Sequence, residues 1–316
     1  MTESIPNPDN DGAPKAPKAR KPRAPTRKLK DVAEIKNDLP MQMNFWPDEV
    51  RGVPNVALRG ALFSISQERE MAKKRQRLET VGGYQVMFKG ERWNQNDLDL
   101  WEMLLHLGRQ QPYGEQVEFK ASDLLKALDR GTGGTDYEEL KEDISRLMSG
   151  TLEITLTHTG KTFIGHLIKN AFREEATQRY VVIFDEKIRM LYDDGYTHVD
   201  WEQRNKLKKN NLARWLHGFY ATHAAPLPYT VDKIRALCGS TTGRLTDFRK
   251  ALRVALDRLK VVGAITSSNI DPETDQVKVR RRASVSQQRH MQKKQALENA
   301  KEFDGNTGTL AGFDSQ

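Results

Sequence analysis

Basic side chains gather in one short stretch near the carboxyl end of the chain, at Arg244, Arg249, Lys250 and Arg253, with Thr246 among them. Guanidinium and ammonium groups bind phosphate oxygens, and an arginine fork also pairs with the edge of guanine. The chemistry available to this set is therefore recognition of a polyanion, with no covalent step. An ordinary solvated amphipathic helix would carry the same charges. The neighbouring elements are therefore needed to distinguish a polyanion-binding helix from a solvated one.

The same stretch carries an apolar stripe at helical spacing. Its members follow one another by three and four residues, which is the period of one helix face: Leu245, Phe248, Leu252, Leu256 and Leu259. The spacing predicts a helix over 243–262 whose apolar face joins a core and whose basic face remains in solvent.

The elements around this helix follow a recognisable order. Residues 211–224 read as a helix, 227–239 as a strand residue or two and a helix, and 264–281 as two strands around a turn. Basic residues end the second strand and follow it, namely Lys278, Arg280, Arg281 and Arg282. A helix-turn-helix followed by a basic hairpin is the winged-helix plan, which favours DNA binding.

An earlier part of the chain repeats this order roughly 110 residues upstream. Helices are expected over 97–111, 120–129 and 136–150, with a short strand after the first and two strands over 151–168 as the hairpin. The predicted fold class is therefore α+β, with two tandem winged-helix domains.

The third helix of the first half differs in charge from that of the second. Its acids outnumber Lys141 and Arg146, and they are Asp136, Glu138, Glu139, Glu142 and Asp143. Phosphates would repel such a helix, so the first half is expected to contact another protein.

Composition narrows the class of protein. The chain has 316 residues, a formal net charge of +8 and 37% hydrophobic residues, which indicates a polyanionic partner and a portion that forms no core. Cys238 is the single cysteine, which excludes an intramolecular disulfide and a cysteine-built zinc site. Neither a signal peptide nor a membrane-spanning run is visible, so we expect a cytoplasmic protein with no membrane partner.

Catalytic patterns are missing from the sequence. The glycine-rich stretch 131–134 lacks the Lys-Ser/Thr of a phosphate-binding loop, and the seven histidines do not fall at metal-ligand spacing. A nuclease or relaxase would need clustered carboxylates, or a histidine pair with a nucleophilic tyrosine, and neither is visible. We expect no catalytic residue, no metal and no cofactor, and no enzyme activity.

From about Phe45 to Arg280 the chain resembles the TrfA-type plasmid replication initiators. The stretches that carry the resemblance are WPDEVRGVPNVALRGALF (46–63), FKGERWNQNDLDLW (88–101), GRQQPYGE (108–115), VDWEQR (199–204), WLHGFYATHAAPLPY (215–229), LCGS (237–240) and RLTDFRKALRVALDRLK (244–260). The resemblance implies tandem winged-helix domains that bind direct repeats (iterons) in double-stranded plasmid origin DNA, and a second domain that is the main reader. It also implies active monomers in equilibrium with inactive homodimers, a first domain that supplies the dimer contact and auxiliary DNA contacts, and recruitment of the host replicative helicase and host initiator protein.

Members of the family can carry a peptide that binds the DNA polymerase sliding clamp just before this region. The matching residues here are Gln42, Met43, Phe45 and Trp46, but Phe45 replaces a leucine and the motif runs directly into Trp46-Pro47. Two interpretations stay open: a clamp-binding peptide, or an arm whose aromatic side chains pack on the first domain.

Five segments follow from these patterns. The expected boundaries are a disordered basic arm (1–40), an N-terminal family-specific segment with short strands (41–95), two winged-helix domains (96–195 and 196–283) and a flexible tail (284–316). The leading hypothesis is non-catalytic plasmid replication initiation through origin repeats. The alternative is a winged-helix transcriptional regulator, which would use the same DNA-binding residues and need no helicase.

Overall fold

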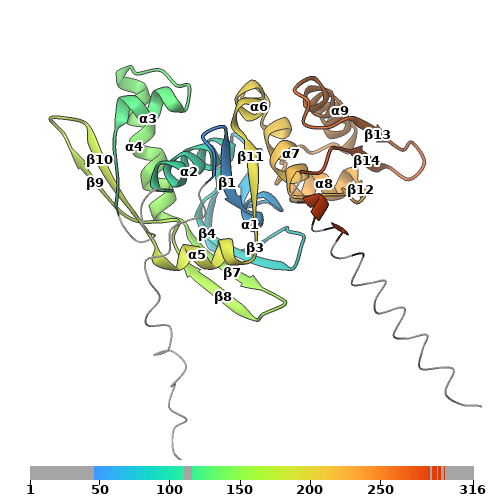
Figure 1. Ribbon diagram of the computed structural model, residues 1–316, viewed down its shortest axis with the longest axis horizontal. Helices are drawn as coiled ribbons and strands as arrows, with labels where there is room; N and C mark the ends of the chain where they lie inside the picture. The colour runs from blue at the N-terminus through green and yellow to red at the C-terminus, as the bar shows by residue number, and fades with distance from the viewer. Residues whose placement is uncertain (1–45, 110–115, 285–286, 290, 293–294, 296–316) are drawn as a thin grey trace, which may run out of the picture. The chain divides into compact units, whose positions relative to one another are not determined.

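The computed structural model describes residues 46–109, 116–284, 287–289, 291–292 and 295 (Figure 1). The basic arm, most of the tail, and Gln42, Met43 and Phe45 of the clamp motif lie outside the described residues. The elements are a mixture of helices and antiparallel strands, with one short parallel pair between β2 and β5.

The described part opens with short strands and one long hairpin. Its elements are β1 (Val50–Pro54), α1 (Asn55–Leu58), β2 (Phe63–Ser64), β3 (Met71–Leu78), β4 (Tyr84–Glu91) and β5 (Trp93–Asn94). Asn94 then begins the next helix as its N-cap, because its side-chain oxygen accepts from the backbone N–H of Asn96 at 2.9 Å.

The first module, residues 95–184, has the predicted helices in the predicted order. Its elements are α2 (Gln95–Gly108), β6 (Gln116–Lys120), α3 (Ala121–Ala127), α4 (Gly134–Ser149), β7 (Thr151–Leu156), β8 (Lys161–Gly165), β9 (Ile168–Glu174) and β10 (Arg179–Phe184). The helices begin and end within a few residues of the expected bounds.

The hairpin that completes the first module is not the one predicted from the sequence. The strands expected over 151–168 exist, but β7 pairs with β4, so β7 and β8 complete a sheet of order β3-β4-β7-β8. The strands that join β6 are β9 and β10, in the order β6-β10-β9. Residues 151–165 do form the expected hairpin, but it is inserted between α4 and the β9–β10 hairpin, which is the one that joins β6 and completes the module. The long-range pairing of β7 with β4 determines where these strands lie, and local periodicity cannot predict that pairing.

Between the modules lie η2 (Glu186–Ile188), α5 (Arg189–Asp193), β11 (Tyr196–Asp200) and α6 (Trp201–Lys206). β11 runs back along β1 as an antiparallel pair, with Val50 opposite Asp200. The start of the described chain is thereby attached to the segment that leads into the second module.

The second module, residues 211–280, matches the prediction most closely. It comprises α7 (Asn211–Ala221), β12 (Tyr229–Thr230), α8 (Val231–Leu237), α9 (Leu245–Val261), β13 (Ser267–Ile270) and β14 (Gln276–Arg280). Its sheet has the order β12-β14-β13, which corresponds strand for strand to β6-β10-β9 of the first module.

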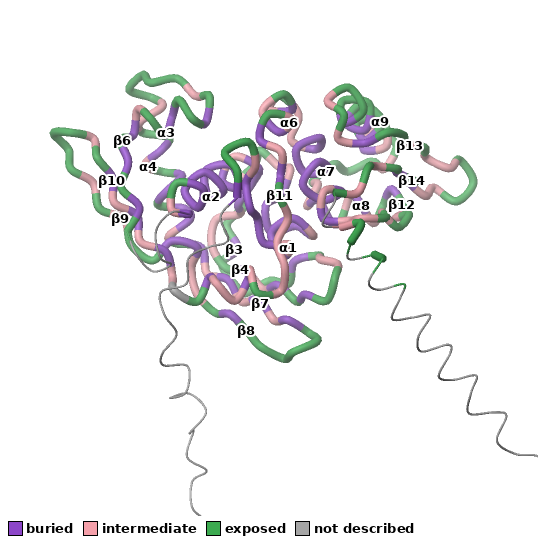
Figure 2. The backbone as a smooth tube through the Cα atoms, viewed as in Figure 1, coloured by how far each residue is buried: buried purple, intermediate pink, exposed green. Residues whose placement is uncertain are grey.

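Buried side chains form two hydrophobic cores, and Figure 2 shows where the buried residues lie along the backbone. The first runs from Trp46 to Trp201 and includes the helices of the first module, and the second runs from Leu207 to Val279. A buried polar cluster links α2 to the second module: Asp99 accepts from Arg204 Nε at 2.5 Å and also from Arg214. Within the described residues, no helix has both the length and the apolar character needed to cross a membrane.

Candidate nucleic-acid interface

One face of α9 is anchored in the second core. Phe248, Leu252, Leu256 and Leu259 are each at most 2% exposed, and Ala255 is buried beside them. Leu245, at the first turn, is half-buried and packs against the same core. The predicted apolar face is confirmed, and it fixes which side of the helix remains in solvent.

The opposite face of α9 presents a polar row. Thr246, Lys250, Arg253 and Asp257 follow at intervals of four, three and four residues, and all four are exposed. Asp257 is paired with Lys260 at 2.6 Å. Among the described residues, no carboxylate lies within ion-pair distance of Lys250 or Arg253, so both cations are available to an outside anion.

Arg244 lies at the N-cap of α9 and is 82% exposed at its side chain. Its Nε donates to Asp247 at 2.7 Å, one turn into the helix. Exposed pairs of this kind contribute little, so the guanidinium can exchange this partner for a phosphate at low cost.

Arg249 points toward the hairpin instead of joining the polar row. Its Nε and Nη2 each donate to a different oxygen of Asp275 at 2.9 Å, which is a bidentate pair. Asp275 lies in the β13–β14 turn with a φ of 55°. Arg249 therefore braces the hairpin against α9.

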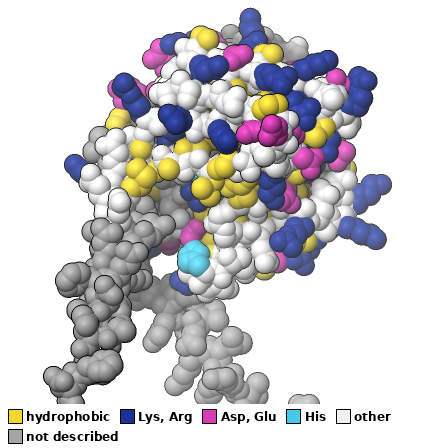
Figure 3. Space-filling model, turned by 90° about the vertical axis from the view of Figure 1, so that its right-hand side faces the viewer, with side chains coloured by type: hydrophobic (Ala, Val, Ile, Leu, Met, Phe, Trp, Pro, Cys, Tyr) yellow, Lys and Arg dark blue, Asp and Glu magenta, His cyan; other side chains and the backbone are white. Residues whose placement is uncertain are grey.

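The hairpin presents its basic residues on one face. Lys278 and Arg280 are exposed, and they alternate along β14 with the buried Val277 and Val279. Lys278 Nζ lies 3.3 Å from Asp271, and Arg282 is exposed just past the strand. Figure 3 faces the right-hand side of Figure 1, where the second module lies, and shows Lys and Arg side chains spread over it with acidic and apolar groups between them.

Arg281 is directed inward, unlike its neighbours. Its Nη1 donates to the backbone carbonyl of His223 and to Gln287 Oε1, both at 2.9 Å, and burial lowers the pKa of Arg281. It attaches the end of β14 to the end of α7. Arg281 directly follows the last residue of β14, and its contacts depend on how the hairpin folds back on α7.

Sequence reasoning missed two residues, Thr230 and Arg235, that hold α8 and the turn from α8 to α9 in place. Thr230 caps α8 by accepting from the backbone N–H of Lys233 at 3.2 Å. Arg235, in the last turn of α8, donates to the carbonyl of Gly243 at 3.2 Å and pairs with Asp232 at 2.7 Å. Arg235 thus fixes the turn between α8 and α9. A threonine directly before a helix is a visible cap signal, whereas the reach of Arg235 to Gly243 is not local.

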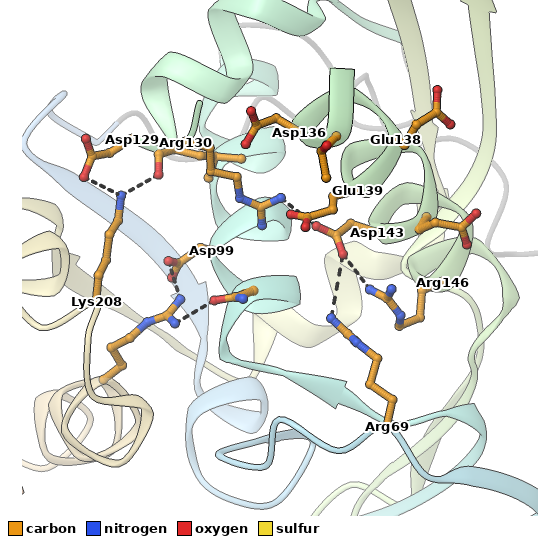
Figure 4. A pocket seen from close by; sticks show the side chains of 15 residues that line it. Arg69, Asp99, Asp129, Arg130, Asp136, Glu138, Glu139, Asp143, Arg146 and Lys208 are labelled. Atoms are coloured by element: carbon orange, nitrogen blue, oxygen red, sulfur yellow. Dashed lines mark hydrogen bonds and ion pairs between the residues drawn. The ribbon is translucent and has the colours of Figure 1, made fainter. Parts of the chain in front are cut away.

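In the first module, the acids of α4 divide into two groups (Figure 4). Asp143 is buried and lies 2.7 Å from both Arg130 and Arg146, and Asp136 accepts from the backbone N–H of Gly133 at the start of the helix. The exposed acids are Glu138, Glu139 and Glu142. They line a cavity of about 640 Å³ next to α4. The surface of this helix is therefore acidic, in contrast with α9.

Trp46, the described member of the clamp motif, is 1% exposed. Its Nε1 donates to His106 Nδ1 at 3.0 Å, and its ring covers Gly52 so closely that a Cβ there would lie 2.7 Å from it. Burial lowers the pKa of His106 to about 4, which keeps the imidazole neutral as this hydrogen bond requires. Trp46 packs on the first core in this structure and is not presented to a clamp.

The TrfA protein family matches residues 15–281. A curated relative, the plasmid replication initiator protein TrfA of Escherichia coli, is 27% identical over 228 residues, which is 70% of this chain and 59% of that protein. The chain thus spans less than two thirds of that relative's length.

Solved structures give weaker likenesses. The crystal structure of domains 2 and 3 of RctB aligns with a TM-score of 0.49 and 12% identity, over 73% of this chain and all of that one. The WH1 domain of a replication protein isolated from a multiple sclerosis patient aligns with a TM-score of 0.26 and 12% identity, over 31% of this chain and 80% of that one. The family match covers most of the chain, and on that ground the chain belongs to the TrfA protein family.

Proposed function

We propose that this protein initiates plasmid replication by binding direct repeats in the plasmid origin through its second module. The observation that carries the proposal is that Lys250 and Arg253, on the solvent face of α9, have no carboxylate partner among the described residues and lie next to a hairpin with its own basic face. Family membership supports the biological setting, since the curated relative is named a plasmid replication initiator.

In this proposal the two modules are tandem winged-helix domains, within the boundaries 96–195 and 196–283. α9 enters the major groove, where Arg253 and Lys250 reach base edges and Thr246 supports the contact. Arg244, Lys278, Arg280 and Arg282 bind phosphates and set the register of the protein on the duplex. Arg249 and Arg281 are assigned a positioning role, because both are engaged within the protein.

The first module has a different task in the same scheme. The exposed acids of α4 disfavour a phosphate contact, so this module contacts protein, including a second copy of the chain. Recruitment of the host helicase and host initiator to opened DNA, in the absence of catalysis, completes the proposed role. A sliding-clamp contact would have to use residues before Trp46.

Footprinting tests the proposal directly. Purified protein is added to the non-coding DNA of the plasmid that encodes it, and the proposal expects protection at several directly repeated sites, each lost in an Arg253→Ala variant. Protection at a single promoter site, with no repeats, would favour the transcriptional regulator. Transformation with an origin plasmid, with and without this gene, separates the two further, because only an initiator is required for plasmid maintenance.

A further inference from the structure

β3 carries an exposed basic run that the proposed function does not use. Between the buried Ala72 and Leu78, residues 73–77 are all exposed, and they read Lys-Lys-Arg-Gln-Arg. Four positive charges and no acid therefore stand side by side on one strand.

A bulge in β3 interrupts its pairing at the basic run. Within the described part of the chain, β3 is an edge of the four-stranded sheet and has β4 as its one neighbouring strand. The register passes from Ala72 opposite Gly90 to Gln76 opposite Phe88, so three residues of β3 face the single residue Lys89. A bulge of this kind bends an edge strand and redirects its side chains.

Most of this charge is not neutralised by the protein. Arg75 pairs with Glu153 at 2.5 Å. Lys73, Lys74 and Arg77 have no carboxylate within ion-pair distance in the part of the chain that the structure describes. Lysine on an edge strand also discourages pairing with other chains, but the bulge already interrupts this edge. The surplus of positive charge needs another explanation.

The end of β3 is attached to the second module. Glu79, directly after the strand, pairs with Lys233 of α8. Val81 packs on the second core, and its backbone N–H donates to the carbonyl of Arg59. The side chain of Arg59 in turn donates from Nε to Thr222 Oγ1 at 3.1 Å. The residues that directly follow β3 are thus tied to the second module, and Glu79 contacts α8, the helix that precedes α9.

We propose that Lys73, Lys74 and Arg77 form a second phosphate-binding surface, which holds the backbone of duplex DNA outside the repeat that α9 reads. This inference rests on the proposed function, and charge complementarity selects the occupant: a duplex presents a dense row of phosphates to a strand that presents three uncompensated cations. The surface lengthens the bound segment and contributes no sequence preference.

The test measures the salt dependence of binding on two duplexes. One holds a single repeat, and the other holds the same repeat extended by about two helical turns, roughly 21 base pairs. For Lys73→Gln with Lys74→Gln, the slope of log K against log salt should flatten by about 1.8 on the extended duplex, at 0.9 per phosphate contact, and stay unchanged on the short one. The matched control is Lys161→Gln with Lys187→Gln, two exposed lysines placed elsewhere, and it should leave both slopes unchanged.

Two results would overturn the inference: equal slopes for the variant and the wild type on the extended duplex, or a reduced preference of the variant for the repeat over a scrambled sequence. If the glutamine variant aggregates, Lys73→Glu with Lys74→Glu keeps the edge charged and is judged by the same comparison. A wild-type protein that shows no preference for any repeat would contradict the proposed function instead, and the comparison of slopes on the extended duplex would still decide the role of β3.

Discussion

Arg249 on α9 and Asp275 in the β13–β14 turn form a bidentate pair, with both N–O distances at 2.9 Å. The pair joins the helix that we assign to the major groove to the hairpin that we assign to the backbone. We therefore propose that Arg249 sets the angle between these two elements and does not itself read bases.

A double-mutant cycle tests this role. Arg249→Ala and Asp275→Ala should weaken binding of a repeat to a similar extent, and the double variant should be no weaker than either, because both remove the same brace. The readout is affinity by fluorescence anisotropy. A much larger loss for Arg249→Ala than for Asp275→Ala would show that Arg249 contacts DNA itself.

Removing the ring of Phe248 should cost about 3–5 kcal/mol of unfolding free energy, because Phe248→Ala leaves a cavity under α9. Val254→Ala is the matched control on the same helix, since Val254 is 51% exposed, and it should change stability little. Urea denaturation measures both. Similar losses in the two variants would mean that the buried face of α9 has been misassigned.

The buried cluster around Asp99 should couple the two modules. Asp99→Ala removes the carboxylate that the buried Arg204 and Arg214 share and leaves Arg204 with the more distant Glu102, at 3.5 Å, so we expect a loss of about 3–5 kcal/mol. Glu202→Ala, which removes an exposed partner of Lys206, is the control and should have little effect. An Asp99→Ala protein as stable as the wild type would show that this cluster does not hold the modules together.

Acid should destabilise the protein through buried histidines. Burial lowers the pKa of His217 to about 3, below the ordinary value of 6.5. Between these values the unfolded chain binds a proton that the folded chain does not, so stability falls as the pH is lowered, by up to about 1.4 kcal/mol per pH unit. Above pH 6.5 the contribution is complete.

The measurement compares His217→Gln with the wild type at several pH values. Glu102 has its pKa raised to about 7 by burial and titrates in the same range with the opposite sign, so the difference between the two proteins isolates His217. That difference should shrink from pH 7 toward pH 4. A difference that stays constant would contradict the assignment.

Charge reversal on α4 should leave repeat binding intact. Glu138→Lys and Glu142→Lys alter exposed acids that we assign to protein contacts, so affinity for a repeat should not fall in gel-shift titrations. A clear loss of specific binding in either variant would place α4 in the DNA interface.

The second module could be predicted almost completely from sequence, because its elements are consecutive and its apolar spacing is regular. The stripe from Leu245 to Leu259 identified α9, and the basic end of the second strand pointed to Lys278 and Arg280, which are exposed along β14. What failed depends on distant partners. The pairing of β7 with β4 joins residues more than 60 positions apart, and it displaced the expected hairpin of the first module.

The site residues divide in the same way, into those that local sequence predicts and those that depend on distant partners. The exposed positions of the polar row follow from helical periodicity alone. The pairing of Arg249 with Asp275 and the contact of Arg281 with the end of α7 arise only when the hairpin folds back on the helices. The burial of Trp46 likewise depends on His106, which lies 60 residues further along the chain.

The central claim is that the solvent face of α9 reads sequence, and Arg253→Ala measured on a repeat and on a scrambled duplex of equal length tests it most directly. We expect a loss of about 1–3 kcal/mol of binding free energy on the repeat, a clearly smaller loss on the scrambled duplex and unchanged unfolding stability. A similar loss on both duplexes would mean that Arg253 touches phosphate only. Full affinity for the repeat in Lys250→Ala with Arg253→Ala would contradict the claim, and α9 would then be an ordinary solvated helix.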